Sequence, residues 1–517
     1  MGISGWNRSA GVLLPITMLF GPMGIGVMGR EAIQWIDMLK GMGIHGWQIL
    51  PAEHTDESYS PYKCVSAFAG SPLLIDLRML RDEGLLTPQD IEERTTGLSD
   101  YTVDYEEIER RQISALEKAY DKLAGDYSGS GKYTDANEYW LEDYALYMVL
   151  RENYSGKPWY EWPDKGLRDY EKDAVDKARE ENAERIGFYK FVQSIFKIQW
   201  ELLKSYAEDN GVSIIGDMPM YVSEDSADVW SLRGQFKTDG AGNLSAVAGV
   251  PPDYFASDGQ RWGNPLYNWQ AMEKDGYSWW TKRMRASMSR YDVIRMDHFR
   301  GFESYYSIPA ESETARNGSW IKGPGAGFFK AVEESIGNLP VFAEDLGDVG
   351  TEVAELLKDT GYMGMRVLQF GFLGDGCHLP HRYDSDTVAY TGTHDNTTLL
   401  AWMYEMDEQT RDRALFYCGY EGQWSKGGAN SGIFLSWLRL LYLSRAKLVI
   451  APIQDFLGYG SDTRINIPGT PRGNWRVRIT KQALSEIDVE YIRRLIEMSD
   501  RGNKVYADDA KPVLEMK

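Results

Sequence analysis

The stretch VIRMDHFRGF, residues 293–302, begins with apolar residues and ends in charged ones. Its first two residues are typical of a buried strand, and Arg295, Asp297 and His298 follow at the end of that strand. Two neighbouring hydrogen-bond donors keep a carboxylate ionised, as a nucleophile requires. The stretch therefore predicts a strand that carries reactive groups at its C-terminal end.

Other runs along the chain share this apolar character and are bounded by glycine, proline or polar residues. Together with DVIRMDHF (292–299) they are GWQILP (46–51), VSIIGDMP (212–219), PVFAEDLG (340–347), GMRVLQF (364–370), TVAYTGTHD (387–395) and KLVIAPIQD (447–455). Each run has the length and composition of a strand in a buried parallel sheet.

Segments with helical spacing lie between many of these runs. The clearest predicts a helix that ends at Asn210-Gly211 and buries a stripe formed by Phe191, Ile195, Ile198 and Leu202. Strands that alternate with helices indicate parallel βα units, and no G-x-G-x-x-G turn follows any of the strands. We therefore predict an α/β fold, a (β/α)8 TIM barrel with inserted, largely helical subdomains around its C-terminal mouth.

The 517 residues are interpreted as a single catalytic barrel domain with insertions. Residues 77–205 are highly charged, break the strand-helix alternation and predict an inserted helical subdomain. Smaller insertions near the mouth are predicted at about 225–290 and 370–390.

Charge and composition exclude several classes of partner. The formal net charge of -21 repels polyanions, which argues against nucleic acid or an anionic membrane as the main partner. No apolar run approaches the roughly 18 residues that span a bilayer. Three scattered cysteines and an N-terminus without a basic lead-in predict a reducing, cytoplasmic location.

Acidic residues stand at the ends of five predicted strands. In a barrel these ends meet at one mouth, so the acids converge on one site. The acids are Asp217, Asp297, Glu344 with Asp345, Asp395 and Asp455. Taken alone, Asp217 and Asp455 are interpreted as helix caps or turn residues.

Two carboxyl groups that act as nucleophile and as acid and base are the minimum for cleaving a glycosidic bond with retention. Crowding by Asp297 and Asp395 is expected to raise the pKa of Glu344, as a general acid requires. A hydrolase metal held by Asp297-His298 and His394-Asp395 is the competing interpretation. Adjacent strand residues point to opposite faces, so each pair offers one inward ligand, and we predict no metal.

The motifs taken together resemble the alpha-amylase clan. They match most closely its amylomaltase branch, also called 4-alpha-glucanotransferases or disproportionating enzymes. The matching segments, in chain order, are AGVLLPIT, GPMGIGVMG, WQILP, SPYKCVSAFAGSP, GDMPMYVSEDSADVW, AGVPPDYFASDGQRWGNPLYNW, IRMDHFRGF, VFAEDLG, YTGTHDN and RINIPGTPRGNW.

The resemblance implies a role for each residue of the site. Asp297 matches the nucleophile, Glu344 the general acid and base, and Asp395 the stabiliser of the distorted sugar. Arg295, His298 and His394 match residues around the cleaved ring. The positions matching those that line the glucan groove are Tyr62, Asp217, Trp262 and Asn466, and residues 251–262 resemble a lid beside the acceptor.

The resemblance also implies the substrates: maltooligosaccharides and other α-1,4-glucans, with no cofactor. Several residues differ from the usual pattern of the family: Met18, Phe20, Met23, Lys63, Cys64, Thr397 and Arg472. Two alternatives stay open, an α-glucan hydrolase of the same clan and a non-catalytic glucan-binding protein on a barrel scaffold.

Overall fold

The computed structural model describes residues 5–123, 137–239, 243–252, 257–347, 349–374, 376–470 and 472–506. Its central sheet has eight parallel strands in the order β10-β11-β12-β1-β2-β3-β6-β9. A parallel bridge between Phe342 in β9 and Met363 beside β10 joins the two ends of this order, so the sheet closes into a barrel. The strands are β1 (Ser9–Leu13), β2 (Gly46–Gln48), β3 (Ser213–Met218), β6 (Val293–Met296), β9 (Val341–Ala343), β10 (Gly364–Val367), β11 (Thr387–Tyr390) and β12 (Leu448–Pro452).

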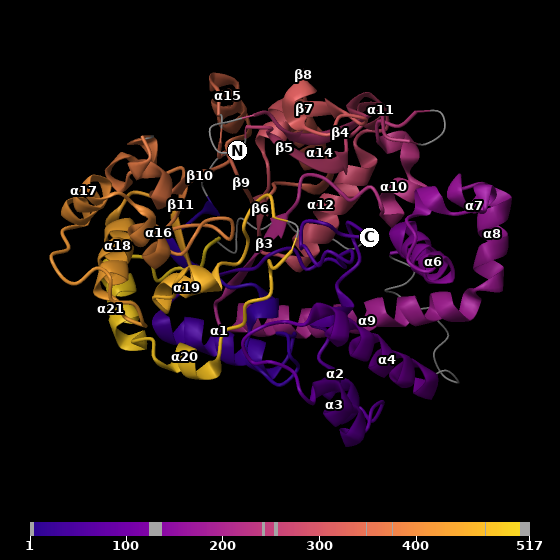
Figure 1. Cartoon of the computed structure of the whole chain (residues 1–517), viewed down its shortest axis with the longest axis horizontal. Coiled ribbons are helices and arrows are strands. Elements are labelled where there is room, and N and C mark those ends of the chain that lie inside the picture. Colours follow the sequence, from indigo (N-terminus) through magenta and orange to yellow (C-terminus); the bar gives the residue numbers. More distant parts are fainter. Residues whose placement is uncertain are drawn as a thin grey trace.

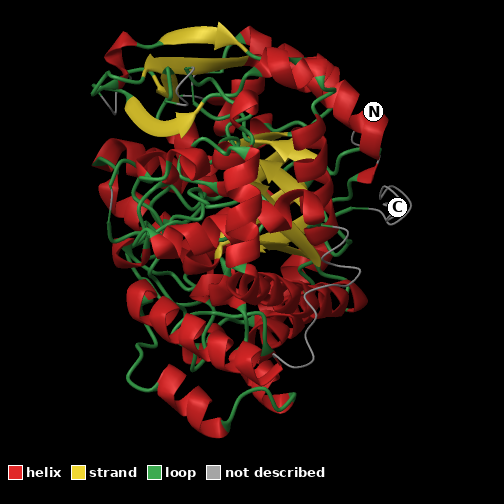
Figure 2. Cartoon of the chain, turned by 90° about the vertical axis from the view of Figure 1, so that its right-hand side faces the viewer, coloured by secondary structure: helices red, strands yellow, loops and turns green. Residues whose placement is uncertain are grey.

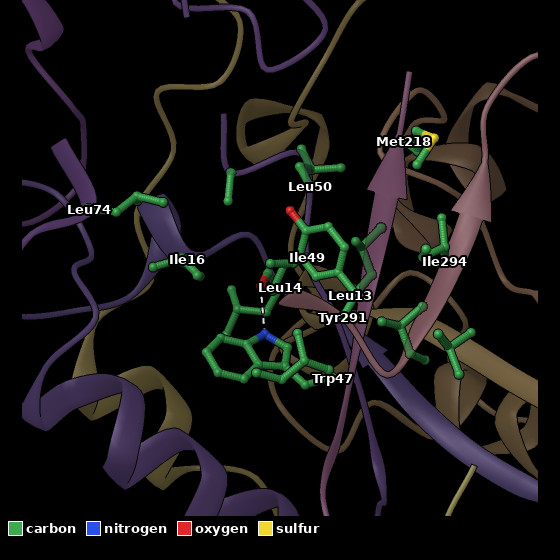
Figure 3. Close-up of a cluster of buried hydrophobic side chains, with 14 of the residues drawn as sticks. Leu13, Leu14, Ile16, Trp47, Ile49, Leu50, Leu74, Met218, Tyr291 and Ile294 are labelled. Atoms are coloured by element: carbon green, nitrogen blue, oxygen red, sulfur yellow. Dashed lines mark hydrogen bonds between the residues drawn. The ribbon is translucent and has the colours of Figure 1, made fainter. Parts of the chain in front are cut away.

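The predicted (β/α)8 barrel is confirmed, and each of the seven predicted runs contains a barrel strand. Strands β3, β6 and β12 are buried at every position, as expected of a parallel sheet covered on both faces. Figure 3 shows part of this core, where the indole nitrogen of Trp47 donates to the carbonyl oxygen of Leu14 at 2.8 Å. The hydrogen bond lets a fully buried tryptophan satisfy its one polar group.

Helices follow most of the strands and surround the barrel (Figure 1). Between β10 and β11, the described residues form three short 3-10 turns in place of an α-helix. The helices that connect the barrel strands or close the chain are α1 (Arg30–Met42), α9 (Ala183–Asp209), α12 (Ser278–Arg290), α14 (Ala326–Ile336), α15 (Thr351–Thr360), α16 (Leu399–Glu405), α17 (Glu408–Cys418), α18 (Gly432–Leu443), α19 (Ile453–Phe456), α20 (Lys481–Ser485) and α21 (Val489–Met498).

Two excursions interrupt the barrel. The first lies between β2 and β3 and is helical, with α2–α4 and α6–α8 on the lower and right-hand sides of Figure 1. The second is a four-stranded antiparallel sheet in the order β5-β4-β7-β8, which stands apart from the barrel strands in Figure 2. Their elements are α2 (Leu77–Asp82), α3 (Pro88–Thr95), α4 (Tyr105–Leu123), α6 (Glu138–Asn153), α7 (Lys165–Arg168), α8 (Lys172–Glu181), β4 (Ala246–Val250), β5 (Gln260–Pro265), β7 (Ser304–Pro309) and β8 (Ser319–Lys322), with the short helices α10 (Ala227–Ser231), α11 (Trp269–Lys274) and α13 (Arg300–Glu303).

The predicted end of helix α9 is confirmed, but its predicted buried stripe is partly wrong. The helix ends at Asp209, and Gly211 takes a left-handed φ of 73°. Ile198 and Leu202 are 53% and 54% exposed, although Phe191 is buried. The buried side of α9 instead includes glutamines that bind the backbone of the segment after β2.

The start of the barrel is held by one buried arginine, Arg501. Its guanidinium donates to the carbonyl oxygens of Ser9, Tyr442, Ser444, Ala446 and Lys447 at 2.8–3.2 Å. These bonds tie the end of α21 to the first residues of β1 and to the segment before β12.

Arg501→Met is expected to lower the free energy of unfolding by about 3 kcal/mol or more, because it removes a buried donor that binds five carbonyl oxygens. A urea unfolding curve measures the change. Arg445→Met, at a side chain that is 75% exposed, is the matched control and is expected to change stability by less than about 0.5 kcal/mol. Equal unfolding midpoints for the two variants would contradict the role assigned to Arg501.

Among the described residues, no helix combines the length and the apolar character that crossing a membrane requires.

Candidate active site

The three predicted catalytic acids lie at the C-terminal ends of barrel strands. Asp297 follows β6 directly, Glu344 follows β9 directly, and Asp395 lies in the loop beyond β11. In a parallel barrel these ends share one mouth, which is where barrel enzymes place their chemistry. Asp297 and Glu344 therefore end strands of one barrel, as expected, whereas Asp395 lies five residues beyond the end of its strand.

Arg295 connects two of the strands at the base of this mouth. One guanidinium nitrogen, Nη1, donates to both carboxylate oxygens of Asp217, at 2.7 and 2.8 Å, and to Oδ1 of Asp297 at 2.9 Å. Asp217 and Arg295 are register partners on β3 and β6, so the sheet itself brings them together. Burial disfavours the guanidinium charge, but these carboxylates outweigh it and raise the pKa of Arg295.

Asp217 is placed under the site rather than at a helix cap or in a turn. Its side chain is fully buried within β3, and burial raises its pKa against the opposing effect of Arg295. The phenol of Tyr62 donates to its Oδ2 at 2.8 Å. The interpretation of Asp217 as a cap or turn residue is therefore wrong, because the carboxylate holds Arg295 and Tyr62.

Glu344 is held by backbone amides. Its Oε2 accepts from the N–H of His298 at 2.8 Å, and its Oε1 accepts from the N–H of Leu346 at 3.0 Å. Burial raises the pKa of Glu344 to about 7; the charge of Asp297 adds to the increase and that of Arg295 opposes it. A carboxyl group with this pKa is partly protonated at neutral pH, as a general acid requires.

The backbone of His298 is bent to make this contact. Its φ is 47°, a left-handed conformation that is uncommon for residues other than glycine. Such conformations cost free energy and occur at functional sites where surrounding contacts hold them. Here the conformation allows the N–H of His298, in the turn after β6, to donate to the carboxylate of Glu344, which follows β9.

Asp395 is the more exposed acid, with 46% of its side chain exposed against 27% for Asp297. Its Oδ1 accepts from the side-chain amide of Asn466 at 2.6 Å. Its Oδ2 lies 3.3 Å from Nε2 of His394. Two residues that the sequence predicted for the site therefore contact the third acid.

Aromatic rings lie beside the acids in two groups. The rings of Tyr62 and His394 stack with centroids 5.1 Å apart, and the indole of Trp475 lies 6.0 and 5.9 Å from them. In the second group, the ring of Trp262 meets that of His298 edge-on, with centroids 4.8 Å apart. Flat apolar faces beside polar groups suit the faces of sugar rings.

His298 is uncharged in this setting. Burial lowers its pKa to about 4, against the opposing charge of Asp297. Its Nε2 is buried and has no hydrogen-bond partner among the described residues. A neutral imidazole with an unused nitrogen is suited to a ligand hydroxyl.

A sequence profile described as 4-alpha-glucanotransferase matches residues 14–484. The chain belongs to the 4-alpha-glucanotransferase family. It is 41% identical to the 4-alpha-glucanotransferase of Streptococcus pneumoniae, over 97% of this chain and 99% of that one. It is also 41% identical to the enzyme of Thermus thermophilus, over 96% of this chain and 99% of that one.

Solved structures agree with the sequence relatives. The amylomaltase from Streptococcus agalactiae in complex with acarbose superposes with a TM-score of 0.91 at 36% identity, covering 96% of this chain and 100% of that chain. The amylomaltase from Corynebacterium glutamicum, at 18% identity and a TM-score of 0.76, covers 97% of this chain and 75% of that one and supports the fold alone. The chain is thus a glycosyltransferase on the barrel that this family shares.

The remaining strand-end acids have structural partners. Asp345 turns away from Glu344 and accepts from the N–H of Met365 at 2.5 Å and from Arg366 at 3.0 Å. Asp455 accepts from Thr391 at 2.6 Å and from the N–H of Leu399, the first residue of α16, at 2.7 Å. The interpretation of Asp455 as a helix cap or turn residue is wrong, because it lies inside α19 and the N-cap of α16 is Thr398.

No described contact joins the three acids to the residues that differ from the usual family pattern. Met18 is buried, while Lys63 and Arg472 are exposed. The hydroxyl of Thr397 donates to Glu405 at 3.2 Å. The side-chain amide of Gln369 donates to the carbonyl oxygen of Thr397 at 2.9 Å. Thr397 therefore stabilises the loop in which it lies.

Other predictions about the mouth stay predictions. Of the lid expected at 251–262, residues 253–256 lie outside the described chain, and Trp262 is on β5. The second sheet takes β4 and β5 from the predicted insertion at 225–290 and β7 and β8 from beyond it. In the described part of the chain, no group of three or more histidine, cysteine or acidic side chains is arranged to hold a metal ion.

Trp475 and Arg464 contact the site but are missed by sequence reasoning. Trp475 stands in the family motif RINIPGTPRGNW with a left-handed φ of 66°. Arg464 begins the same motif and donates to the carbonyl oxygen of Asp395 at 2.5 Å. The motif is the only signal in the sequence for either residue, because both lie far along the chain from the acids.

Proposed function

We propose that the protein transfers segments of α-1,4-glucans to the 4-hydroxyl of an acceptor by a retaining double displacement, with Asp297 as nucleophile and Glu344 as acid and base. The supporting observation is the division of roles between two neighbouring carboxyl groups. Arg295 donates to Asp297, whereas burial brings the pKa of Glu344 to about 7. Environments that separate two carboxyl groups in this way assign the acid and the nucleophile.

In the first step, a carboxylate oxygen of Asp297 forms a bond to the anomeric carbon of the donor. The bond from that carbon to the glycosidic oxygen breaks, and Glu344 gives its proton to the departing oxygen. The products are a shorter glucan and a glycosyl ester on Asp297. Arg295, which donates to Asp297, helps to keep this carboxylate charged before the attack.

In the second step, Glu344 takes the proton from the 4-hydroxyl of an acceptor glucan. The acceptor oxygen attacks the anomeric carbon, the ester bond breaks, and the carboxylate of Asp297 is regenerated. The bond formed is of the same type as the bond broken. The reaction therefore needs neither an energy source nor an added redox or group-carrying cofactor.

Asp395 and the rings support the donor sugar. The exposed carboxylate of Asp395 is suited to accept hydrogen bonds from ring hydroxyls, and contacts that strengthen in the transition state raise the rate. The rings of Tyr62, His394 and Trp475 form one group beside the acids, and those of Trp262 and His298 form a second. The relative with 36% identity was solved in complex with acarbose, which supports a carbohydrate ligand for this chain.

Incubation with maltotriose alone, followed by chromatography over time, tests the proposal. We expect a ladder of longer maltooligosaccharides together with glucose, because each transfer lengthens one chain and shortens another. Shorter products without a ladder would support the hydrolase. Glucan binding without turnover would support the binding protein.

The choice of maltooligosaccharides as the natural substrates and of the cytoplasm as the location rests on the sequence, and both stay predictions. No disulfide joins the three cysteines, all of which lie in the described part of the chain.

A further inference from the structure

Asp395 is the acid that the barrel itself positions least. Strand β11 ends at Tyr390, and Asp395 lies beyond it in a loop. Almost half of its side chain is exposed. Asp297 and Glu344, in contrast, directly follow their strands. Something other than the sheet must therefore hold Asp395 in the geometry that its role needs.

A second segment, residues 464–466, lies against this loop. The backbone N–H of Asn466 donates to the carbonyl oxygen of His394 at 3.2 Å, and its side-chain amide donates to Oδ1 of Asp395 at 2.6 Å. The guanidinium of Arg464 joins the two segments. It donates through Nη2 to the carbonyl oxygen of Asp395 at 2.5 Å and through Nε to the carbonyl oxygen of Asn466 at 2.8 Å.

The segment is itself anchored in the body of the protein. Ile465 is only 3% exposed, and its carbonyl oxygen accepts from the N–H of Trp475 at 2.8 Å. The side chain of Gln454 on α19 donates to the carbonyl oxygen of Thr463 at 3.0 Å. The segment that Arg464 binds to Asp395 is therefore fixed by Gln454 and Trp475, so Arg464 can fix the position of Asp395 in turn.

Arginine suits this task for a geometric reason. Its planar guanidinium presents several N–H groups in fixed directions, so one side chain sets the separation of two carbonyl groups. Fixing the backbones of Asp395 and Asn466 relative to each other brings the Asp395 carboxylate to the Asn466 amide. A lysine has one flexible ammonium group and does not fix two acceptors in this way.

We propose that Arg464 is a positioning residue for glucan transfer that acts through Asp395. The inference rests on the role proposed above for Asp395. Arg464 has no described contact with Asp297 or Glu344, and it bonds the backbone of Asp395 and not its carboxylate. Its effect is therefore expected on the rate of the chemical steps, where a misplacement of about 1 Å can cost roughly 100-fold.

Steady-state kinetics with maltotriose tests the inference. Arg464→Gln is expected to lower kcat by about 10- to 100-fold with KM within about threefold of the original value. Arg464→Lys keeps the charge and guards against a folding defect, and its kcat is expected to fall at least about fivefold because it cannot span both carbonyl groups. Arg476→Gln is the matched control, since Arg476 also donates to a backbone oxygen, that of Val103, and is expected to keep kcat within about twofold.

A double-mutant cycle separates positioning from a general structural effect. In the Asp395→Asn background, adding Arg464→Gln is expected to lower kcat by less than about threefold more, because the group that Arg464 positions is already impaired. Losses that multiply, or an unchanged kcat in both Arg464 variants, would overturn the inference. Wild-type turnover by Asp395→Asn would instead overturn the role of Asp395 itself, so the two failures are distinguishable.

Discussion

Asp297→Ala is expected to lower the rate of glucan transfer by roughly 10⁴-fold or more while glucan binding is retained. The substitution removes the oxygen that forms the bond to the anomeric carbon, so neither step of the double displacement proceeds. The substitution leaves both groups of aromatic rings unchanged. Removal of the partner leaves Arg295 paired with Asp217, which already accepts two of its hydrogen bonds.

Asp297→Asn removes the negative charge of the side chain and keeps its size and shape. The amide oxygen can still accept from Arg295, so the site keeps its geometry, but the amide is not a nucleophile. We expect a loss similar to that of the alanine variant. Asp384→Asn, at a side chain that is 81% exposed, is the control and should leave turnover unchanged.

Chromatography of maltotriose products measures turnover, and calorimetric titration with a maltooligosaccharide measures binding. Turnover within tenfold of the wild type in either Asp297 variant would falsify the nucleophile assignment. Loss of both binding and turnover in the asparagine variant would show that Asp297 holds the groove together.

The barrel is predictable from sequence because its strands are buried on both faces and therefore read as apolar runs. Strand β1 (Ser9–Leu13) is not among the seven predicted runs. Its sequence, SAGVL, opens with small residues and is soon followed by Pro15, so it lacks the length of a typical run. Pairing with β12 on one side and β2 on the other decides its conformation, and sequence periodicity does not record such pairing.

Helix α9 shows why the side of a helix that is buried is harder to predict. Gln193 binds the amide and the carbonyl of Gly70 at 2.8 and 2.9 Å, and Gln199 binds those of Asp76 at 2.7 and 3.0 Å. Both glutamines are buried, while Ile198 is exposed. A side-chain amide that is hydrogen-bonded to the backbone of a loop can be buried with little loss of free energy. A prediction that ranks residues by hydrophobicity alone therefore places such glutamines on the wrong side of the helix.

The site likewise contains some residues that the sequence predicts and some contacts that depend on packing. Asp297 and Glu344 are predictable because the barrel topology brings the ends of β6 and β9 to one mouth. The buried position of Asp217, the stack of Tyr62 on His394 and the contact of Arg464 with Asp395 depend on how separate loops pack. Such contacts join residues far apart in sequence, and strand-end reasoning contains no information about them.

Glu344→Gln is expected to lower transfer from maltotriose by about 10²- to 10⁴-fold, the usual contribution of general acid-base catalysis. The amide has the size of the carboxyl group and keeps an oxygen for the N–H of His298 or Leu346. It holds no transferable proton. Glu355→Gln, on the exposed side of α15, is the control and should change nothing.

The pH dependence gives the sharper test of Glu344. Its pKa is raised to about 7, so the protonated form, which the first step needs, predominates below pH 7 and is lost above it. For the wild type, kcat/KM with maltotriose should therefore fall on the alkaline side of about pH 7, and this limb should be absent in Glu344→Gln. A limb that survives the substitution would mean that another group titrates.

A donor that needs no protonation isolates the acid role from the base role. With α-maltosyl fluoride the departing fluoride leaves without a proton, so formation of the glycosyl ester on Asp297 no longer depends on Glu344 as acid. Glu344→Gln should then release fluoride in a rapid first turnover and stall before transfer to the acceptor, because no base activates the 4-hydroxyl. Equal impairment of fluoride release and of maltotriose cleavage would contradict the assignment, since a group that acts by proton transfer must matter less when no proton is required.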